Sequence, residues 1–177
     1  HLEAGLRSFN RRMPEEHNRV LTDHCSDLLL APTEVAMSHL ANEGLAHRAV
    51  LVGDVMTDVL YATRDKVRAA GSEGVSGHER GSYYVATLHR PDNTDDAERL
   101  RKIIDALAHL DRPVVLLAHP RLRANADTFG IALDRPMIHV HEPLSYPRVV
   151  AAIMGSAGVI TDSGGLQKEA FLLRVPT

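Results

Sequence analysis

The sequence contains no tryptophan, one cysteine and no marked excess of either charge. Its single cysteine, Cys25, has no disulfide partner within these residues, so we expect a reducing, cytoplasmic location. The net charge of −3 provides no basic surface for nucleic acid or an anionic membrane. No apolar run approaches the length of a membrane span. These absences predict a protein with neither a nucleic-acid partner nor a membrane partner.

The composition that remains is typical of a globular protein. Hydrophobic residues make up 44% and charged residues 24% of the 177 positions, enough for one full core or two smaller ones. The sequence opens at His1 without a methionine and stops at Val175-Pro176-Thr177, which resembles the approach to another strand. We therefore expect these residues to be the interior of a longer protein.

Short β-type runs alternate with helical patterns along the chain. Strands are expected at residues 27–31, 49–52, 83–88, 114–118, 138–141 and 158–161. Helices are expected at residues 16–26, 34–43, 55–70, 96–110, 146–154 and 165–173. Because the strand runs are apolar throughout, both faces of their sheet should be covered. The alternation predicts a parallel, doubly wound α/β sheet.

Two local features refine this pattern. Thr33 can cap the helix that follows it, and Asp95 with Glu98 resembles a capping box. Residues 71–82 are rich in glycine, serine and charge and have no periodicity, which predicts a linker or mobile loop. Together they suggest parts of two Rossmann-like units.

The run Asp162-Ser163-Gly164-Gly165 lies where a predicted strand passes into a predicted helix. Ligands of open α/β sheets bind at the carboxyl ends of strands, and glycines at a helix start let backbone amides approach a phosphate. Glu169, further along the helix, could accept both hydroxyls of a ribose. A tight turn followed by a solvated glutamate would give the same pattern.

A second group is the charged segment near the start of the chain, within HLEAGLRSFNRRMPEEHNR. Such clusters are usually solvated faces. Glu3, however, has apolar neighbours, and Pro14 suits a helix start that would place Glu15 in the first turn. Two carboxylates near arginines could act as base and acid.

A third group is polar and follows strongly apolar strands. His89 and Arg90 end one strand, where a histidine could move protons or bind phosphate and an arginine could pair with phosphate. His119 ends another strand at the same edge. His139 and His141 share one face of a strand, but no third ligand with metal-site spacing accompanies them, so we expect no metal.

The motifs HLEAGLRS, RRMPEEHNR, LLLAPTE, VGDVMTDVL, TLHRPDN and TDSGGLQKEA follow in an order that resembles the non-hydrolysing UDP-N-acetylglucosamine 2-epimerases. The similarity covers essentially the whole chain. It implies the GT-B arrangement of two Rossmann-like domains with parallel sheets, both incomplete in this chain. Residues 1–53 would belong to the first domain and residues 54–177 to the second, UDP-binding domain.

The resemblance also implies roles for particular residues. Glu3 and Glu15 match acidic residues implicated in catalysis, and His89 matches an essential histidine near the phosphates. The diphosphate-binding loop corresponds to Ser163, Gly164 and Gly165. Glu169 matches the glutamate that holds the ribose. Arg90 and His119 complete the expected substrate-binding set. Further catalytic and nucleotide contacts of the family would lie outside residues 1–177.

The implied reaction is inversion at C2 of UDP-N-acetylglucosamine by elimination and re-addition of UDP through 2-acetamidoglucal, giving UDP-N-acetylmannosamine. No net oxidation occurs, so no cofactor is expected. The family further implies a cytoplasmic homodimer that serves cell-surface polysaccharide biosynthesis. Two alternatives remain: a GT-B glycosyltransferase that uses a UDP-sugar, and an inactive fragment that binds nucleotide sugars.

Overall fold

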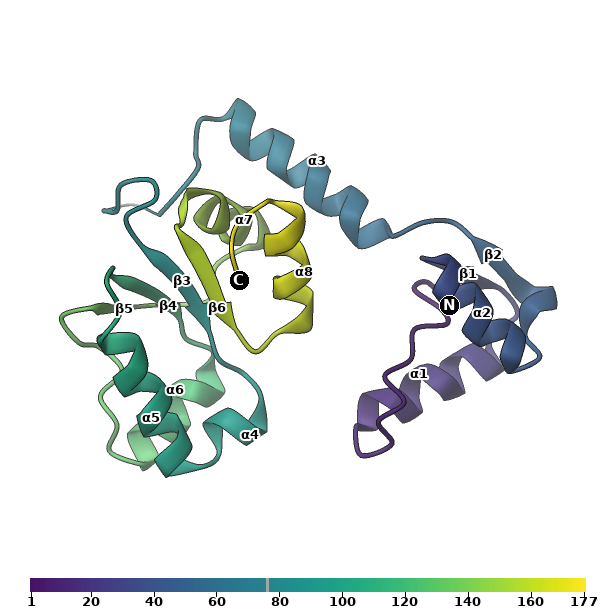
Figure 1. The fold of residues 1–177 in the computed structure, drawn as a ribbon, viewed down its shortest axis with the longest axis horizontal. Helices are drawn as coiled ribbons and strands as arrows, with labels where there is room; N and C mark the ends of the chain where they lie inside the picture. The colour runs from purple at the N-terminus through teal and green to yellow at the C-terminus, as the bar shows by residue number, and fades with distance from the viewer. Residues whose placement is uncertain (76) are drawn as a thin grey trace. The chain divides into compact units, whose positions relative to one another are not determined.

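The computed structural model describes residues 1–75 and 77–177. The chain divides into two compact units, His1–Val59 and Leu60–Thr177. Helix α3 (Val55–Ala69) contributes residues to both units (Figure 1). Assignment of the two family domains to residues 1–53 and 54–177 stays a prediction. In the part of the chain described, none of the helices combines the length and the apolar character that a membrane span requires.

The first unit has a small parallel sheet. Strand β1 (Leu29–Ala31) pairs with β2 (Ala49–Leu51), and on its other side Leu2 forms a parallel bridge with Leu30. The chain around Leu2 therefore acts as a third parallel neighbour, and Glu3 follows it at the carboxyl side. The helical elements are α1 (Pro14–Cys25), α2 (Glu34–Asn42) and the 3-10 helix η1 (Ala46–Arg48).

The second unit is built on a four-stranded parallel sheet. Its strands are β3 (Tyr84–Thr87), β4 (Val114–Leu117), β5 (Ile138–His141) and β6 (Gly158–Thr161). Their spatial order is β5-β4-β3-β6. This is the order in which the first four strands of a Rossmann fold lie, and its direction of progression reverses between β3 and β6. That reversal marks where the carboxyl ends of two strands leave room for a ligand.

Both faces of this sheet are covered, as the apolar strands predict. The side chains of β4 alternate between the two faces, so Val114 and Leu116 enter one core cluster and Val115 and Leu117 enter the other. Helices α5 (Ala97–Ala108) and α6 (Pro120–Thr128) cover the first face (Figure 1). Helices α7 (Tyr146–Gly155) and α8 (Gly164–Leu172) cover the second.

The expected elements all form, with small differences at their ends. The short helix α4 (Pro91–Thr94) and helix α6 were not predicted. Helix α6 is mostly polar, and only Leu122 and Ala126 are buried, which leaves little apolar periodicity to detect.

The predicted helix cap is confirmed for α2 and wrong for α5. The Thr33 hydroxyl accepts a hydrogen bond from Ala36 N at 3.1 Å, so it caps α2 as expected. The predicted cap of α5 is wrong, because Asp96 accepts from Arg99 N at 2.7 Å. Asp95 instead pairs with Arg121 on α6. The two adjacent aspartates could not be told apart until α6 was placed beside α4.

The glycine-rich stretch 71–82 lies inside the second unit, and its described residues pack on α7. Gly74 N donates to Ala151 O and Gly81 N donates to Gly155 O, each at 2.7 Å. Its expected role as a linker or mobile loop stays a prediction. At Gly155 the approach is so close that an added Cβ would lie 2.5 Å from Gly74 Cα and 2.8 Å from the Tyr83 hydroxyl.

Replacing Gly155 with alanine should therefore destabilise the protein. Alanine normally favours a helix, but here its methyl group meets backbone that cannot yield, and overpacking of this kind typically costs about 1–3 kcal/mol. Urea unfolding of the full-length protein measures the effect. Gly164→Ala is the matched control, because no atom lies within 4 Å of its added Cβ. Equal stability of the two variants would contradict the packing described.

Candidate active site

The candidate site lies at the carboxyl ends of β3 and β6, where the strand order reverses. The two strands lie side by side (Figure 1). They pair in register, with Thr87 opposite Thr161 and their hydroxyl oxygens 2.6 Å apart. The residues that follow each strand therefore emerge at the same level. These are His89 and Arg90 on one side and Asp162 and Ser163 on the other.

The carboxylate of Asp162 joins the two strand ends. It accepts from His89 N and from His89 Nδ1, the latter at 2.6 Å. It also accepts from Arg90 N at 2.9 Å and from Asn93 Nδ2 at 3.0 Å. Its side chain is 9% exposed. Burial by itself would raise the pKa of Asp162, but the bonds from Asn93, Arg90 N and His89 N outweigh it, and the pKa lies below its usual value.

The sequence-predicted pair His89 and Arg90 is thus held in different ways. The His89 ring is 50% exposed and uses Nδ1 on Asp162, which leaves Nε2 as the nitrogen available to a ligand. Arg90 contributes its backbone amide to Asp162, while its exposed guanidinium has no partner among residues 1–75 and 77–177.

The start of α8 presents free backbone donors. Ser163 caps this helix, and its hydroxyl accepts from Leu166 N at 3.3 Å. The amides of Gly164 and Gly165 open the helix, where no intrahelical acceptor exists. The space beside Gly164 is open, since nothing lies within 4 Å of an added Cβ. Such a helix start, with its positive dipole end, is suited to a phosphate group.

A pocket of about 290 Å³ adjoins these groups. His89, His119 and Ser163 line it together with Thr87 of β3 and with apolar side chains that follow β3 or come from β4, from α8 and from around α7. The fold thus brings three of the predicted residues to one place. His119 caps α6 and accepts from Arg121 N through Nδ1 at 3.2 Å. Its proton therefore sits on Nε2, which makes that nitrogen a donor.

Glu169 lies on α8 and is half-buried. Its carboxylate accepts a hydrogen bond from the Tyr146 hydroxyl at 3.0 Å. Burial first, and then this bond and the charge of Glu169, raise the pKa of Tyr146 to about 12. Tyr146 therefore stays a neutral donor that orients Glu169, and one carboxylate oxygen remains for another partner.

In the first unit, Glu3 stands in a turn that glycine makes possible. Glu3 itself has a positive φ of 65°, which is uncommon for a residue with a side chain. Gly5 follows with φ of 79°, and an added Cβ there would lie 2.4 Å from Ala36 O on α2. The Glu3 carboxylate is half-buried and has no partner in the described part of the chain.

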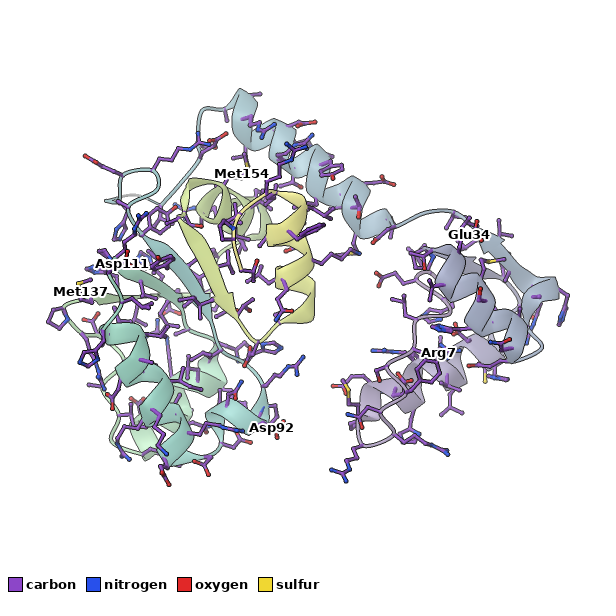
Figure 2. The ribbon with its side chains drawn as sticks, viewed as in Figure 1. Arg7, Glu34, Asp92, Asp111, Met137 and Met154 are labelled. Atoms are coloured by element: carbon purple, nitrogen blue, oxygen red, sulfur yellow. The ribbon has the colours of Figure 1, made fainter. Side chains whose placement is uncertain are left out.

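Buried charges hold this turn in place. Asp23, fully buried, accepts from Gly5 N at 3.0 Å and pairs with Arg7 at 2.7 Å and with His1 at 2.5 Å. Arg7, labelled in Figure 2, is 1% exposed and also pairs with Glu43 at 2.8 Å. The bond to Glu43 raises the pKa of Arg7 and lowers the pKa of Glu43. This part of the charged segment is an internal ion-pair network rather than a solvated face.

The two adjacent glutamates at the start of α1 differ in their surroundings. Glu16 is buried and accepts from Phe9 N at 2.8 Å and from the amide and hydroxyl of Ser8. Glu15 is exposed. Of the pair, Glu16 therefore fixes the loop after Arg7, and Glu15 is the one that can meet a ligand.

The histidines of β5 belong to a different region. The ring of His139 lies 5.1 Å from that of His78, and burial, with the charges of His139 and His141, lowers the pKa of His78. In residues 1–75 and 77–177 there is no group of three histidine, cysteine or acidic side chains arranged to hold a metal ion.

Comparison with known proteins identifies the family. The family model described as UDP-N-acetylglucosamine 2-epimerase matches residues 1–177. This chain belongs to the UDP-N-acetylglucosamine 2-epimerase family. The relative at 45% identity over 183 residues is the UDP-2,3-diacetamido-2,3-dideoxy-D-glucuronate 2-epimerase of Pseudomonas aeruginosa, with 99% of this chain and 49% of that protein covered. The UDP-N-acetylglucosamine 2-epimerase of Methanocaldococcus jannaschii is 36% identical over 190 residues, with 99% and 51% covered.

Solved structures of epimerases share the fold. The M. jannaschii enzyme in complex with UDP-GlcNAc and UDP matches with a TM-score of 0.82 at 36% identity, covering 99% of this chain and 51% of that one. The Neisseria meningitidis enzyme bound to UDP-GlcNAc matches with a TM-score of 0.83 at 27% identity, again covering 99% and 51%. The predicted family and the GT-B-like α/β class are confirmed. The chain spans about half the length of the epimerases it matches.

Sequence reasoning did not find every residue that shapes this candidate site. It treated Asp162 only as part of a turn and did not consider Asn93 or Tyr146. A signal for Asp162 existed, because it stands at a strand end directly before a helix cap. No signal in the sequence paired it with His89, which lies 73 positions earlier.

The difference between Glu16 and Glu15 leads to a prediction about acid stability. Burial alone would raise the pKa of Glu16, but the hydrogen bonds from Ser8 and Phe9 and the charge of Arg19 lower it below its ordinary 4.5. A lowered folded-state pKa stabilises the fold above the unfolded-state value, and this contribution is lost as the pH falls through the folded-state value. Glu16→Gln should cost about 1–2 kcal/mol at neutral pH and flatten the decline in stability below about pH 4.5.

Urea unfolding of the full-length protein at several pH values measures this effect. Glu15→Gln is the matched control, since the adjacent carboxylate is exposed and should leave the wild-type profile unchanged. A Glu16→Gln profile parallel to that of the wild type would show that the carboxylate does not hold the loop in its charged form.

Proposed function

We propose that the whole protein to which this chain belongs interconverts UDP-N-acetylglucosamine and UDP-N-acetylmannosamine by inverting C2 of the sugar. The observation that supports this most is the switch point of the second unit. There the open start of α8 and the His89 ring, held by Asp162, border one pocket beside family motifs. The relatives that carry the same family assignment include epimerases solved with UDP-GlcNAc.

The second unit, in this proposal, binds the UDP part of the substrate. The Gly164 and Gly165 amides and the Ser163 hydroxyl donate to the diphosphate, helped by the helix dipole. His89 and the Nε2–H of His119 add side-chain donors, and the exposed guanidinium of Arg90 adds charge. Glu169, oriented by Tyr146, accepts from the ribose hydroxyls through its remaining lone pairs.

Chemistry at C2 is assigned to the first unit. A carboxylate removes the C2 proton while the bond from C1 to the UDP oxygen breaks, giving UDP and 2-acetamidoglucal. UDP then adds back at C1 as a proton returns to the opposite face of C2. Glu3 and Glu15 are the proposed proton-transfer groups, since both carboxylates are accessible and held on rigid backbone. The departing diphosphate is stabilised by the donors of the second unit.

The route involves no net oxidation, so the proposal includes no cofactor. A homodimer and a cytoplasmic location are proposed with it, on the family resemblance and the cysteine content. A GT-B glycosyltransferase would use the same diphosphate site but would not need the paired glutamates. A chain that binds the nucleotide sugar without reaction is the remaining alternative.

A second substrate has its own support. The Pseudomonas relative, at 45% identity, is named for a UDP-2,3-diacetamido-2,3-dideoxy-D-glucuronate, whereas the M. jannaschii relative at 36% is named for UDP-N-acetylglucosamine. Both substrates carry a 2-acetamido group and a UDP leaving group, so the same elimination serves either. The two substrates differ at positions of the sugar other than C2, so the residues assigned to chemistry at C2 do not distinguish between them.

Incubation of the full-length protein with each UDP-sugar in deuterated water tests the function. We expect deuterium at C2 and a mixture of the two C2 epimers, observed by NMR and mass spectrometry, without added nicotinamide or metal. The UDP-sugar with the larger kcat/KM indicates the chemical class of the natural substrate. Transfer of the sugar to an acceptor would favour the glycosyltransferase, and binding without exchange would leave a nucleotide-sugar-binding protein.

The assignment of Glu3 and Glu15 predicts a separation of chemistry from binding. Glu3→Gln and Glu15→Gln should each lower kcat by about 10²–10⁴-fold, the usual contribution of a positioned acid or base, with little change in UDP affinity. Kinetics and calorimetry of the full-length variants measure both quantities. Glu98→Gln, in the first turn of α5, is a control expected to behave as wild type. Near-normal turnover in both test variants would exclude the paired-carboxylate mechanism.

A further inference from the structure

The contact between Asp162 and His89 has the geometry of an oriented histidine. Asp162 Oδ1 lies 2.6 Å from His89 Nδ1 and also accepts from the His89 backbone amide. We infer that Asp162 is a positioning residue, which fixes His89 with its Nδ1 proton on the carboxylate so that Nε2 meets the departing diphosphate. This inference rests on the proposed function, because the diphosphate is the group that His89 would serve.

Asp162 is itself held firmly enough for this task. Asn93 Nδ2 and Arg90 N bind its second oxygen at 3.0 and 2.9 Å, so the carboxylate cannot rotate away from the ring. The side chain is 9% exposed, and its lowered pKa keeps it ionised near neutral pH. With Nδ1 bonded to the carboxylate, Nε2 is the ring nitrogen that faces a phosphate oxygen, and it donates there when it carries the second ring proton.

The second histidine of the pocket, His119, carries its ring proton on the other nitrogen. His119 accepts at Nδ1 from Arg121 N, so its proton lies on Nε2. His89 has the opposite assignment, with its proton on Nδ1. Both rings line the same pocket. His119 thus offers its Nε2–H to the pocket, whereas His89 offers an Nε2 that can give a proton to the leaving UDP as negative charge grows on it.

If Asp162 had only a structural role, its bonds to Arg90 N, His89 N and Asn93 would hold the loop in place. Its bond to the His89 ring would then have no effect on turnover. The substitution Asp162→Asn separates the structural role from the positioning role. The asparagine oxygen can still accept from the backbone amides, but its Nδ2 donor faces His89 Nδ1 and forces the ring proton onto Nε2.

The first measurement reads the tautomer in the full-length wild-type protein. Nitrogen-15 NMR of the histidine rings, with His89 assigned by its loss in His89→Ala, should show the proton on Nδ1. Addition of UDP should shift Nε2 and leave Nδ1 protonated. A ring without a proton on Nδ1 in the unliganded protein would overturn the inference without any variant of Asp162, so a folding defect in the variant cannot hide the answer.

The second measurement is kinetic. Asp162→Asn should lower kcat by about 10²–10⁴-fold, the usual contribution of a positioned acid or base, with a far smaller change in KM. The reason is that a ring whose Nδ1 accepts from the amide cannot carry protons on both nitrogens. The double variant with His89→Ala should be no slower than His89→Ala alone, because the carboxylate acts through the ring. Asp96→Asn is the matched control, an aspartate that caps α5 without contact to either histidine.

The outcomes separate this inference from the proposed function. If the wild type converts neither UDP-sugar, the function fails, and the ring spectrum alone then decides the tautomer. If the wild type is active and His89→Ala is impaired, two results would overturn the inference. One is wild-type turnover in Asp162→Asn, and the other is independent, multiplying effects of the two substitutions.

Discussion

The candidate site depends on the hydrogen bonds that the Asp162 carboxylate accepts. This carboxylate accepts from donors that follow β3 and from Asn93 on α4, while it stands itself at the end of β6. The parallel sheet brings these ends level but does not fix the loops beyond them. A buried charge that needs several donors fixes them, since its desolvation is offset only when those bonds are made together. The pocket, the ring of His89 and the start of α8 take their positions from that requirement.

The first unit uses the same physical device. Asp23 holds the turn after Glu3 through Gly5 N and Arg7, and Glu16 holds the next loop through the amides of Ser8 and Phe9. In each case a buried carboxylate organises irregular backbone, and an accessible carboxylate, Glu3 or Glu15, is displayed nearby. Removing one member of such a network leaves an unpaired buried charge, so these loops are rigid because their alternatives are costly.

Much of the fold follows from local pattern. The apolar runs predict strands buried on both faces, and the structure shows alternate side chains of β4 entering opposite cores. The prediction is wrong for β2 of the first unit, where Val50 and Leu51 are exposed. Thr33 predicts the start of α2. Helix α6 escaped detection because its stability comes from packing of Leu122 and Ala126 and from contacts with α4, rather than from an amphipathic sequence. Asp95 was misplaced as a cap for the same reason, since its partner Arg121 is distant in sequence.

The sequence by itself determined the family, the α/β class and the edge of the sheet where His89 and Ser163 would meet, because strand periodicity and motif order are local properties of the chain. It did not determine which of two adjacent acids is buried, which ring nitrogen of His89 is free, or that Tyr146 orients Glu169. Only the tertiary structure decided these points. Each depends on a hydrogen-bond partner brought close by the crossover of β6 to β3 or by the packing of one helix on another, and burial makes such a bond obligatory.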